Sequence, residues 1–232
     1  MSILLLVRHG QASFGKEDYD ALSDLGHEQA RVLGRTLAAR GVLPDLIVRG
    51  EMRRHRETAE GILEGLASAR GATEVEIDGG WDEFDFEHVM ARHRAPDGSR
   101  VGLPVDDAST PAAEVRARFQ AIFEAATSRW IDGGADEDYH ESFASFGARV
   151  DAAARRAAQR RERTVLVVTS GGPIGLVASR LLAGDASLWP SLNRVAVNTA
   201  VTKVLRGRTR LTLSTYNEHS HLEHDRALVT YR

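Results

Sequence analysis

Two uninterrupted apolar runs constrain the fold of this chain more than any other feature. Residues 3–7 (I-L-L-L-V) and 164–169 (T-V-L-V-V-T) are rich in branched side chains and show no alternation of apolar and polar positions. Such runs are typical of parallel strands that helices cover on both faces. A third, shorter strand is expected at 45–48. The chain is therefore expected to fold around a buried sheet.

Helical patterns separate the predicted strands. Ser23 is a suitable cap for the helix that follows it, and Gly41 is a suitable stop. The order of the elements predicts an α/β fold with a doubly wound, mostly parallel sheet flanked by helices. Helices are expected at 23–40, 53–66 and 173–182, and further strands at 195–206 and 208–216.

The strand pattern disappears between residues 81 and 161. Prolines and glycines mark 94–111 as a loop, and helices are expected at about 111–130 and 142–161. We interpret 84–150 as a mainly helical insertion that could lie over a site. The whole chain, 1–232, is then expected to be a single domain.

Composition excludes several classes of function. The chain has a net charge of −3, which gives no field that would attract nucleic acid or an anionic membrane surface. It has no cysteine, so disulfides, thiolate catalysis and cysteine-bound metals are excluded. The run at 3–7 is too short for a signal peptide, and no stretch reaches membrane length. A cytoplasmic protein is expected.

Polar residues follow both long strands at the point where each strand ends. Arg8 and His9 supply a cation and a possible nucleophile after the first strand. Ser170 and Gly171 follow the other strand and open a helix, where exposed N–H groups can bind an anion. Because ligands of α/β sheets bind where strands end, the two ends predict one anion site. Each segment alone could also be an ordinary turn.

Two further charged residues are candidates for the same site. Arg54 stands at the start of the helix predicted at 53–66, where a solvated basic helix face is the simpler interpretation for its neighbours. Glu83 lies in W-D-E-F-D-F at 81–86, among aromatic residues. Loss of hydration there would favour the protonated carboxyl that a general acid needs. An alternating edge strand is the other interpretation of 81–86.

Several segments resemble, in the right order, the motifs of the histidine phosphatase (phosphoglycerate-mutase-like) superfamily. The family's S-P-L-x-R-A-x-Q-T-A is similar to G-E-M-R-R-H-R-E-T-A here. The resemblance implies a phosphatase for a small phosphorylated metabolite that works through a phosphohistidine at His9. It also implies phosphate-binding arginines at Arg8 and Arg54, a general acid at Glu83, and no metal or other cofactor. The matching segments are 6–11, 22–30, 50–59, 81–86, 198–202 and 217–222.

Two departures from the family pattern bear on the chemistry of the site. Ser170 stands where the family has a second catalytic histidine, and Gly50 stands where many members have serine. The sequence instead resembles a branch with R-H-G-Q-A-S-F-G and T-S-G-G. A phosphate- or phosphoester-binding protein with weak or lost turnover is therefore one alternative, and phosphoglycerate-mutase-type transfer is another. If Ser170 is a weakened site, Ser170→His should raise the rate; if His55 has taken over, it should not.

A metal site is a third interpretation. His219 and His221 alternate, so that one face of a strand could present both, with His224 nearby. A polar terminal strand explains the same residues.

Overall fold

The computed structural model describes residues 2–13, 20–69, 71, 73–94, 112–207 and 210–231. Residues 1–83 together with 149–232 form one compact unit, and residues 84–148 form a second. The second unit corresponds to the insertion predicted at 84–150. None of the helices in the described part of the chain is long and apolar enough to cross a membrane.

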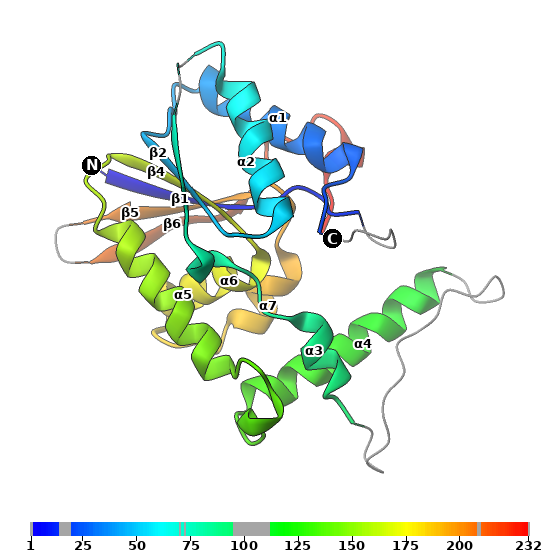
Figure 1. Cartoon of the computed structure of the whole chain (residues 1–232). Helices are drawn as coiled ribbons and strands as arrows, with labels where there is room; N and C mark the ends of the chain where they lie inside the picture. The colour runs from blue at the N-terminus through cyan, green and yellow to red at the C-terminus, as the bar shows by residue number, and fades with distance from the viewer. Residues whose placement is uncertain are drawn as a thin grey trace. The chain divides into compact units, whose positions relative to one another are not determined.

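A six-stranded sheet with the order β3-β2-β4-β1-β5-β6 is the centre of the first unit (Figure 1). Strands β3, β2, β4 and β1 run parallel, β5 is antiparallel to β1, and β6 is antiparallel to β5. The predicted α/β fold with a mostly parallel sheet is confirmed. The strands are β1 Ser2–Arg8, β2 Leu46–Arg49, β3 Glu74–Ile77, β4 Thr164–Thr169, β5 Val201–Arg206 and β6 Leu211–Glu218.

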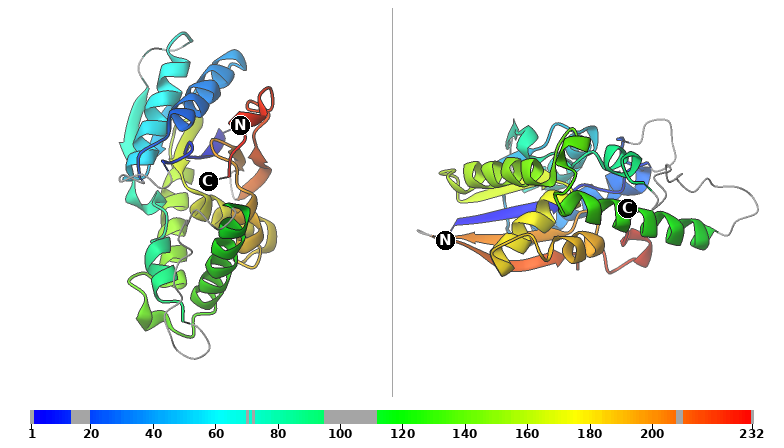
Figure 2. Two further views of the ribbon diagram at one scale, coloured as in Figure 1. Left: turned by 90° about the vertical axis from the view of Figure 1, so that its right-hand side faces the viewer. Right: turned by 90° about the horizontal axis from the view of Figure 1, so that it is seen from below.

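Helices cover both faces of this sheet (Figures 1 and 2). On one face, α1 (Asp24–Ala39) and α2 (Arg53–Leu66) contribute Leu33 and Ile62 to a core that also contains Leu166 of β4. On the other face lie α6 (Gly171–Ala183) and residues 149–158 of α5 (Phe143–Ala158). Burying an aliphatic side chain of this size contributes about 1.5–3 kcal/mol, so these side chains stabilise the packing of the helices on the sheet.

The local signals in the sequence explain the observed helix ends. Ser23 caps α1, because its hydroxyl accepts a hydrogen bond from the Gly26 amide at 3.1 Å. Gly41 follows α1 with φ +66°, a conformation that favours glycine. The first late strand begins at Val201 and not at 195, because the short helix α7 (Trp189–Val195) precedes it.

The second unit has an aromatic core around Trp130. Its ring stacks on Phe84 at 4.7 Å between centroids and lies 5.5 Å from the ring of Phe146. Its helices are α3 (Phe86–Ala91), α4 (Ala112–Ile131) and the first residues of α5. The loop predicted at 94–111 lies outside the described residues except for residue 94.

The segment 81–86 is not a strand. A 3-10 turn occupies Gly79–Trp81, and α3 begins at Phe86. Asp85 ends the irregular stretch between them, because its side chain accepts a hydrogen bond from the His88 amide at 2.9 Å and caps α3. The edge-strand interpretation of 81–86 is therefore wrong.

Candidate active site

Three neighbouring strands deliver the first elements of the candidate site. Strands β1 and β4 are parallel neighbours whose register pairs Arg8 with Thr169, and the His9 amide donates to the Thr169 carbonyl at 2.8 Å. Strand β2 borders β4 on its other side, and the Gly50 amide donates to the Val168 carbonyl at 3.2 Å. The residues that follow these strands therefore meet at the carboxyl edge of the sheet, where α/β proteins bind ligands.

His9 is buried, with 7% of its surface exposed. Its Nδ1 lies 2.7 Å from the Gly10 carbonyl oxygen. A carbonyl oxygen only accepts, so Nδ1 carries the proton and Nε2 carries the lone pair. Burial, with the positive charges of Arg54 and Arg8, holds the pKa of His9 well below 6.5. The imidazole is therefore neutral near pH 7, as a nitrogen nucleophile must be.

The chain around His9 is fixed by contacts from the neighbouring helices. The Gly10 amide donates to Thr58 Oγ1 of α2 at 3.0 Å, and the Gln11 amide donates to Gln29 Oε1 of α1 at 2.8 Å. A Cβ atom on Gly10 would lie 2.4 Å from the Gly26 carbonyl oxygen, so only glycine allows this approach. These contacts hold the histidine in one position.

A second support comes from the segment before β5. Asn198 Nδ2 donates to the His9 carbonyl at 3.0 Å, and the Thr199 amide donates to the Arg8 carbonyl at 3.0 Å. Thr199 has φ +57°, which strains a β-branched residue by about 1–3 kcal/mol. Its hydroxyl lies 3.1 Å from Nε2 of the buried His221. The sequence motif at 198–202 did not indicate this supporting role.

Arg54 and Arg8 lie close enough to His9 to lower its pKa. Arg54 is in the first turn of α2, 6% exposed, and its Nη1 is 2.7 Å from Asp20 Oδ1. Its buried Nε has no hydrogen-bond partner within the part of the chain that the structure describes. Arg8 Nη1 donates to the carbonyl oxygens of Tyr231, at 2.8 Å, and Ala196.

Glu83 lies against the start of α6. Its Oε2 accepts a hydrogen bond from the Gly172 amide at 3.1 Å. A Cβ atom on Gly172 would lie 2.0 Å from Glu83 Oε1, so a larger residue would displace the carboxylate. At Gly171, a Cβ atom would lie 3.8 Å from Arg8 Nε. The structure thus brings Glu83, Arg8 and Gly171 to the same helix end, where the Glu83 carboxylate occupies the Gly172 amide.

Ser170 is fully buried and is paired with a second imidazole. It is the N-cap residue of α6, but its side chain makes no capping hydrogen bond. Its Oγ lies 2.8 Å from Nε2 of His55, which is also fully buried and comes from α2. The His55 and His9 rings are 5.8 Å apart. His55 Nδ1 is 3.5 Å from Asp82 Oδ1. The sequence offered His55 only as an alternative and did not predict its contact with Asp82.

The electrostatics of His55 have opposing contributions. Burial lowers its pKa, and Arg54 acts in the same direction, while Asp82 and Asp20 raise it; the net shift is downward. Burial alone would raise the pKa of Asp82, but the nearby His55 and hydrogen bonds from the amides of Glu51 and Met52 lower it. Asp82 is therefore ionised beside a buried imidazole.

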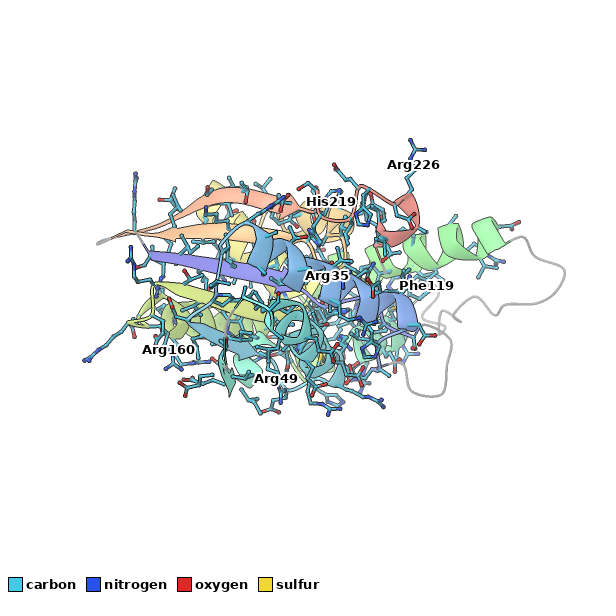
Figure 3. All side chains as sticks on the ribbon, turned by 90° about the horizontal axis from the view of Figure 1, so that it is seen from above. Arg35, Arg49, Phe119, Arg160, His219 and Arg226 are labelled. Carbon is cyan, nitrogen blue, oxygen red and sulfur yellow. The ribbon has the colours of Figure 1, made fainter. Side chains whose placement is uncertain are left out.

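The C-terminal histidines do not form a metal centre. Strand β6 ends at Glu218, so neither His219, which is labelled in Figure 3, nor His221 lies on a strand face. His219 Nδ1 contacts the Asn217 carbonyl at 2.7 Å, and His224 Nδ1 contacts the His221 carbonyl at 3.0 Å. Across the described ranges, no three His, Asp or Glu side chains gather as a metal ion would require.

Several solved structures share this fold. A mycobacterial glucosyl-3-phosphoglycerate phosphatase in complex with VO3 has a TM-score of 0.62 and 23% identity, covering 94% of this chain and 100% of that one. A phosphoserine phosphatase from Entamoeba histolytica has a TM-score of 0.61 and 18% identity, covering 96% and 100%. The alpha-ribazole phosphatase from Shigella flexneri has a TM-score of 0.59 and 21% identity, covering 93% and 96%.

Sequence comparison gives the family. A 2,3-bisphosphoglycerate-dependent phosphoglycerate mutase from Chelativorans sp. (strain BNC1) is 33% identical over 111 residues, 45% of this chain. The match spans about half of that relative, 48% of its length. The pattern of the histidine phosphatase superfamily (branch 1) matches residues 4–109 and 106–219. The chain belongs to the histidine phosphatase superfamily, branch 1.

Proposed function

We propose that this protein is a phosphatase that hydrolyses a small phosphorylated metabolite through a phosphohistidine at His9. The observation that carries the proposal is the state of the His9 ring. Its Nδ1 proton is held by the Gly10 carbonyl, so the lone pair is on Nε2, and two arginines are near. This arrangement suits attack on an anionic phosphoryl group.

The proposed reaction has two steps. His9 Nε2 attacks phosphorus, the ester P–O bond breaks, and the leaving alkoxide takes a proton from Glu83. Water then attacks the phosphohistidine while Glu83 takes a proton from it, which releases inorganic phosphate and restores the starting state. Glu83 is the candidate for this role because the Gly172 amide fixes its carboxyl group at the start of α6.

The positive charge for this reaction comes from the chain itself. Arg8 and Arg54 would neutralise the phosphoryl oxygens, on which negative charge must be stabilised in the transition state. The buried Nε of Arg54, for which the described residues offer no acceptor, is a ready donor to such an oxygen. The scheme requires no cofactor, and the proposed partner is the phosphorylated substrate alone.

The similar proteins include both phosphatases and a mutase. The three structures named above are phosphatases of small phosphorylated compounds, although their identities of 18–23% support only the fold. The curated relative is a mutase, which makes mutase-type transfer the second candidate. The two differ in product, because a phosphatase releases inorganic phosphate and a mutase returns an isomeric phosphate ester.

Phosphate release by the purified protein tests the proposal. Wild type, His9→Ala and the exposed-site control His224→Ala are assayed against a panel of phosphomonoesters, with phosphate and ester products both measured. We expect phosphate release by wild type and the control, and a loss of roughly 10³-fold or more in His9→Ala. Turnover that survives in His9→Ala contradicts the proposal. Vanadate binding without any turnover would support a phosphate-binding protein instead.

A further inference from the structure

Three positions in the site fit together in space. His55 Nε2 touches Ser170 Oγ at 2.8 Å, and both residues are fully buried. A Cβ atom on Gly50 would lie 2.3 Å from His55 Nδ1 and 2.4 Å from Asp82 Oδ1. The imidazole of His55 therefore requires a residue without a side chain at 50, and it leaves no room for a large side chain at 170.

The same three positions are departures from the family pattern quoted above. That pattern has serine at position 50, alanine at position 55 and histidine at position 170, where this chain has Gly50, His55 and Ser170. The three departures are compatible with one another, because the imidazole of His55 fills space that smaller residues at positions 50 and 170 leave free. The site thus keeps two imidazoles, but the second comes from α2 and not from the end of β4.

Backbone contacts fix the position of the carboxylate beside this imidazole. Asp82 Oδ1 accepts hydrogen bonds from the amides of Glu51, at 2.7 Å, and Met52, at 3.4 Å, and lies 3.5 Å from His55 Nδ1. An ionised carboxylate there favours a proton on Nδ1, which turns the Nε2 lone pair toward the Ser170 hydroxyl. Burial lowers the pKa of His55, so in the empty site its Nε2 accepts the hydroxyl proton of Ser170. The negative charge of a phosphoryl group bound nearby favours protonation of Nε2. Nε2 then donates to Ser170 Oγ, and the hydroxyl proton becomes available to a phosphoryl oxygen.

The hydroxyl of Ser170 does not cap helix α6. A serine at an N-cap commonly binds the amides of the first helical turn, but Ser170 makes no such bond, and the Gly172 amide is bound to Glu83. Ser170 follows β4 directly beside the end of β1, where His9 lies. The contact with His55 therefore orients a hydroxyl at the edge of the sheet where the phosphoryl group would be bound.

We propose that His55, which lies beside Asp82, is the positioning residue that directs the Ser170 hydroxyl to the phosphoryl group on His9, and so replaces a histidine at the end of β4. The proposal rests on the function proposed above. A positioned donor of this kind is worth about 10²–10³ in kcat. Its effect falls mainly on kcat, because the hydrogen bond strengthens as charge develops on the phosphoryl oxygens.

Moving the histidine back tests the proposal. The variants are His55→Ala, Ser170→Ala, the double variant of both, Ser170→His, and His55→Ala combined with Ser170→His. His224→Ala is the exposed control, and kcat, KM, vanadate inhibition and thermal unfolding are measured for each. We expect His55→Ala and Ser170→Ala each to lower kcat by about 10²–10³-fold with a much smaller change in KM.

The combinations separate a positioning role from a structural one. The double alanine variant should lose no more than either single variant, because the two residues act as a unit. Ser170→His alone should be impaired, since His55 already fills the space. His55→Ala combined with Ser170→His should recover kcat at least tenfold over His55→Ala. A purely structural His55 would not allow this rescue.

Defined results would overturn the inference without touching the proposed function. If His9→Ala is inactive while His55→Ala keeps kcat within twofold of wild type, the inference is wrong and the phosphatase proposal stands. Additive losses of kcat in the double alanine variant also overturn the inference. So does a folded variant with His55→Ala and Ser170→His whose kcat is no higher than that of His55→Ala. If His55→Ala does not fold, His55→Leu replaces it: the side chain fills the space but offers Ser170 no hydrogen bond, so an undiminished kcat would contradict the role. Full activity in His9→Ala would instead contradict the proposed function.

Discussion

The buried His221 makes a specific contribution to stability that depends on pH. The residue is 6% exposed, and burial lowers its pKa to about 4, aided by Arg40, His219 and His224 and opposed by Glu218. In the unfolded chain the pKa returns to about 6.5. Below pH 6.5 the unfolded chain therefore binds a proton that the folded chain does not. The stability from a neutral His221 is present above pH 6.5 and is lost as the pH falls toward 4.

The size of this loss follows from the two pKa values. Between pH 7 and pH 5, linkage gives about 2 kcal/mol for a group whose pKa differs by about 2.5 pH units between the two states. Urea unfolding of wild type and His221→Asn at pH 7, 6 and 5 measures it. The variant should lose about 2 kcal/mol less than wild type over this range, because His9 and His55 contribute equally to both proteins. His140→Asn, at an exposed position that does not contribute to the His221 shift, should follow wild type. Equal losses in wild type and His221→Asn would refute the reasoning.

Three further predictions concern the candidate site. Glu83→Gln should lower kcat/KM for alkyl phosphates by about 10²–10⁴-fold but much less for activated aryl phosphates, which need no proton on the leaving group; equal losses would remove Glu83 from the acid role. Arg54→Gln should raise the inhibition constant for vanadate by roughly tenfold or more, since a charged donor is lost; an unchanged constant would place the anion elsewhere. Thr58→Val should lower the free energy of unfolding in urea by about 1–3 kcal/mol, because the buried Gly10 amide loses its acceptor; no change would mean that this amide finds another partner.

The sequence predicted the buried elements of the sheet well. The runs at 3–7 and 164–169 correspond to β1 and β4, and the helix expected at 53–66 is α2. Strand β3 was missed because it lies at the sheet edge and leaves Val75 39% and Ile77 58% exposed, so it carries no apolar run. Helix α7 was missed because it has only seven residues, of which only Trp189 is buried.

The candidate site divides in the same way. His9, Arg8, Arg54 and Glu83 stand in or beside local motifs, so their places could be predicted, and the structure brings them together. The pairing of His55 with Ser170 could not be predicted in the same way, because it joins residues 115 positions apart whose contact depends on the register of three strands. The contact between Asp82 and His55 could not be predicted either, since the position of Asp82 depends on the backbone amides at 51 and 52. The contacts of Thr199 with Arg8 and His221 also join segments that are distant in the sequence, so local motifs could not predict them.

Trapping the phosphorylated enzyme tests the central claim, that His9 carries the phosphoryl group. The protein is mixed with a substrate labelled at phosphorus, quenched in base during turnover, and digested to locate the label. We expect an acid-labile, base-stable label on the peptide that contains His9, and none in His9→Ala. Ser170 is the alternative nucleophile. Its hydroxyl lies 2.8 Å from His55, and the imidazole lies 3.5 Å from Asp82. An imidazole placed between a serine and a carboxylate in this way can activate the serine. An acid-stable, base-labile label on the peptide that contains Ser170 would contradict the account.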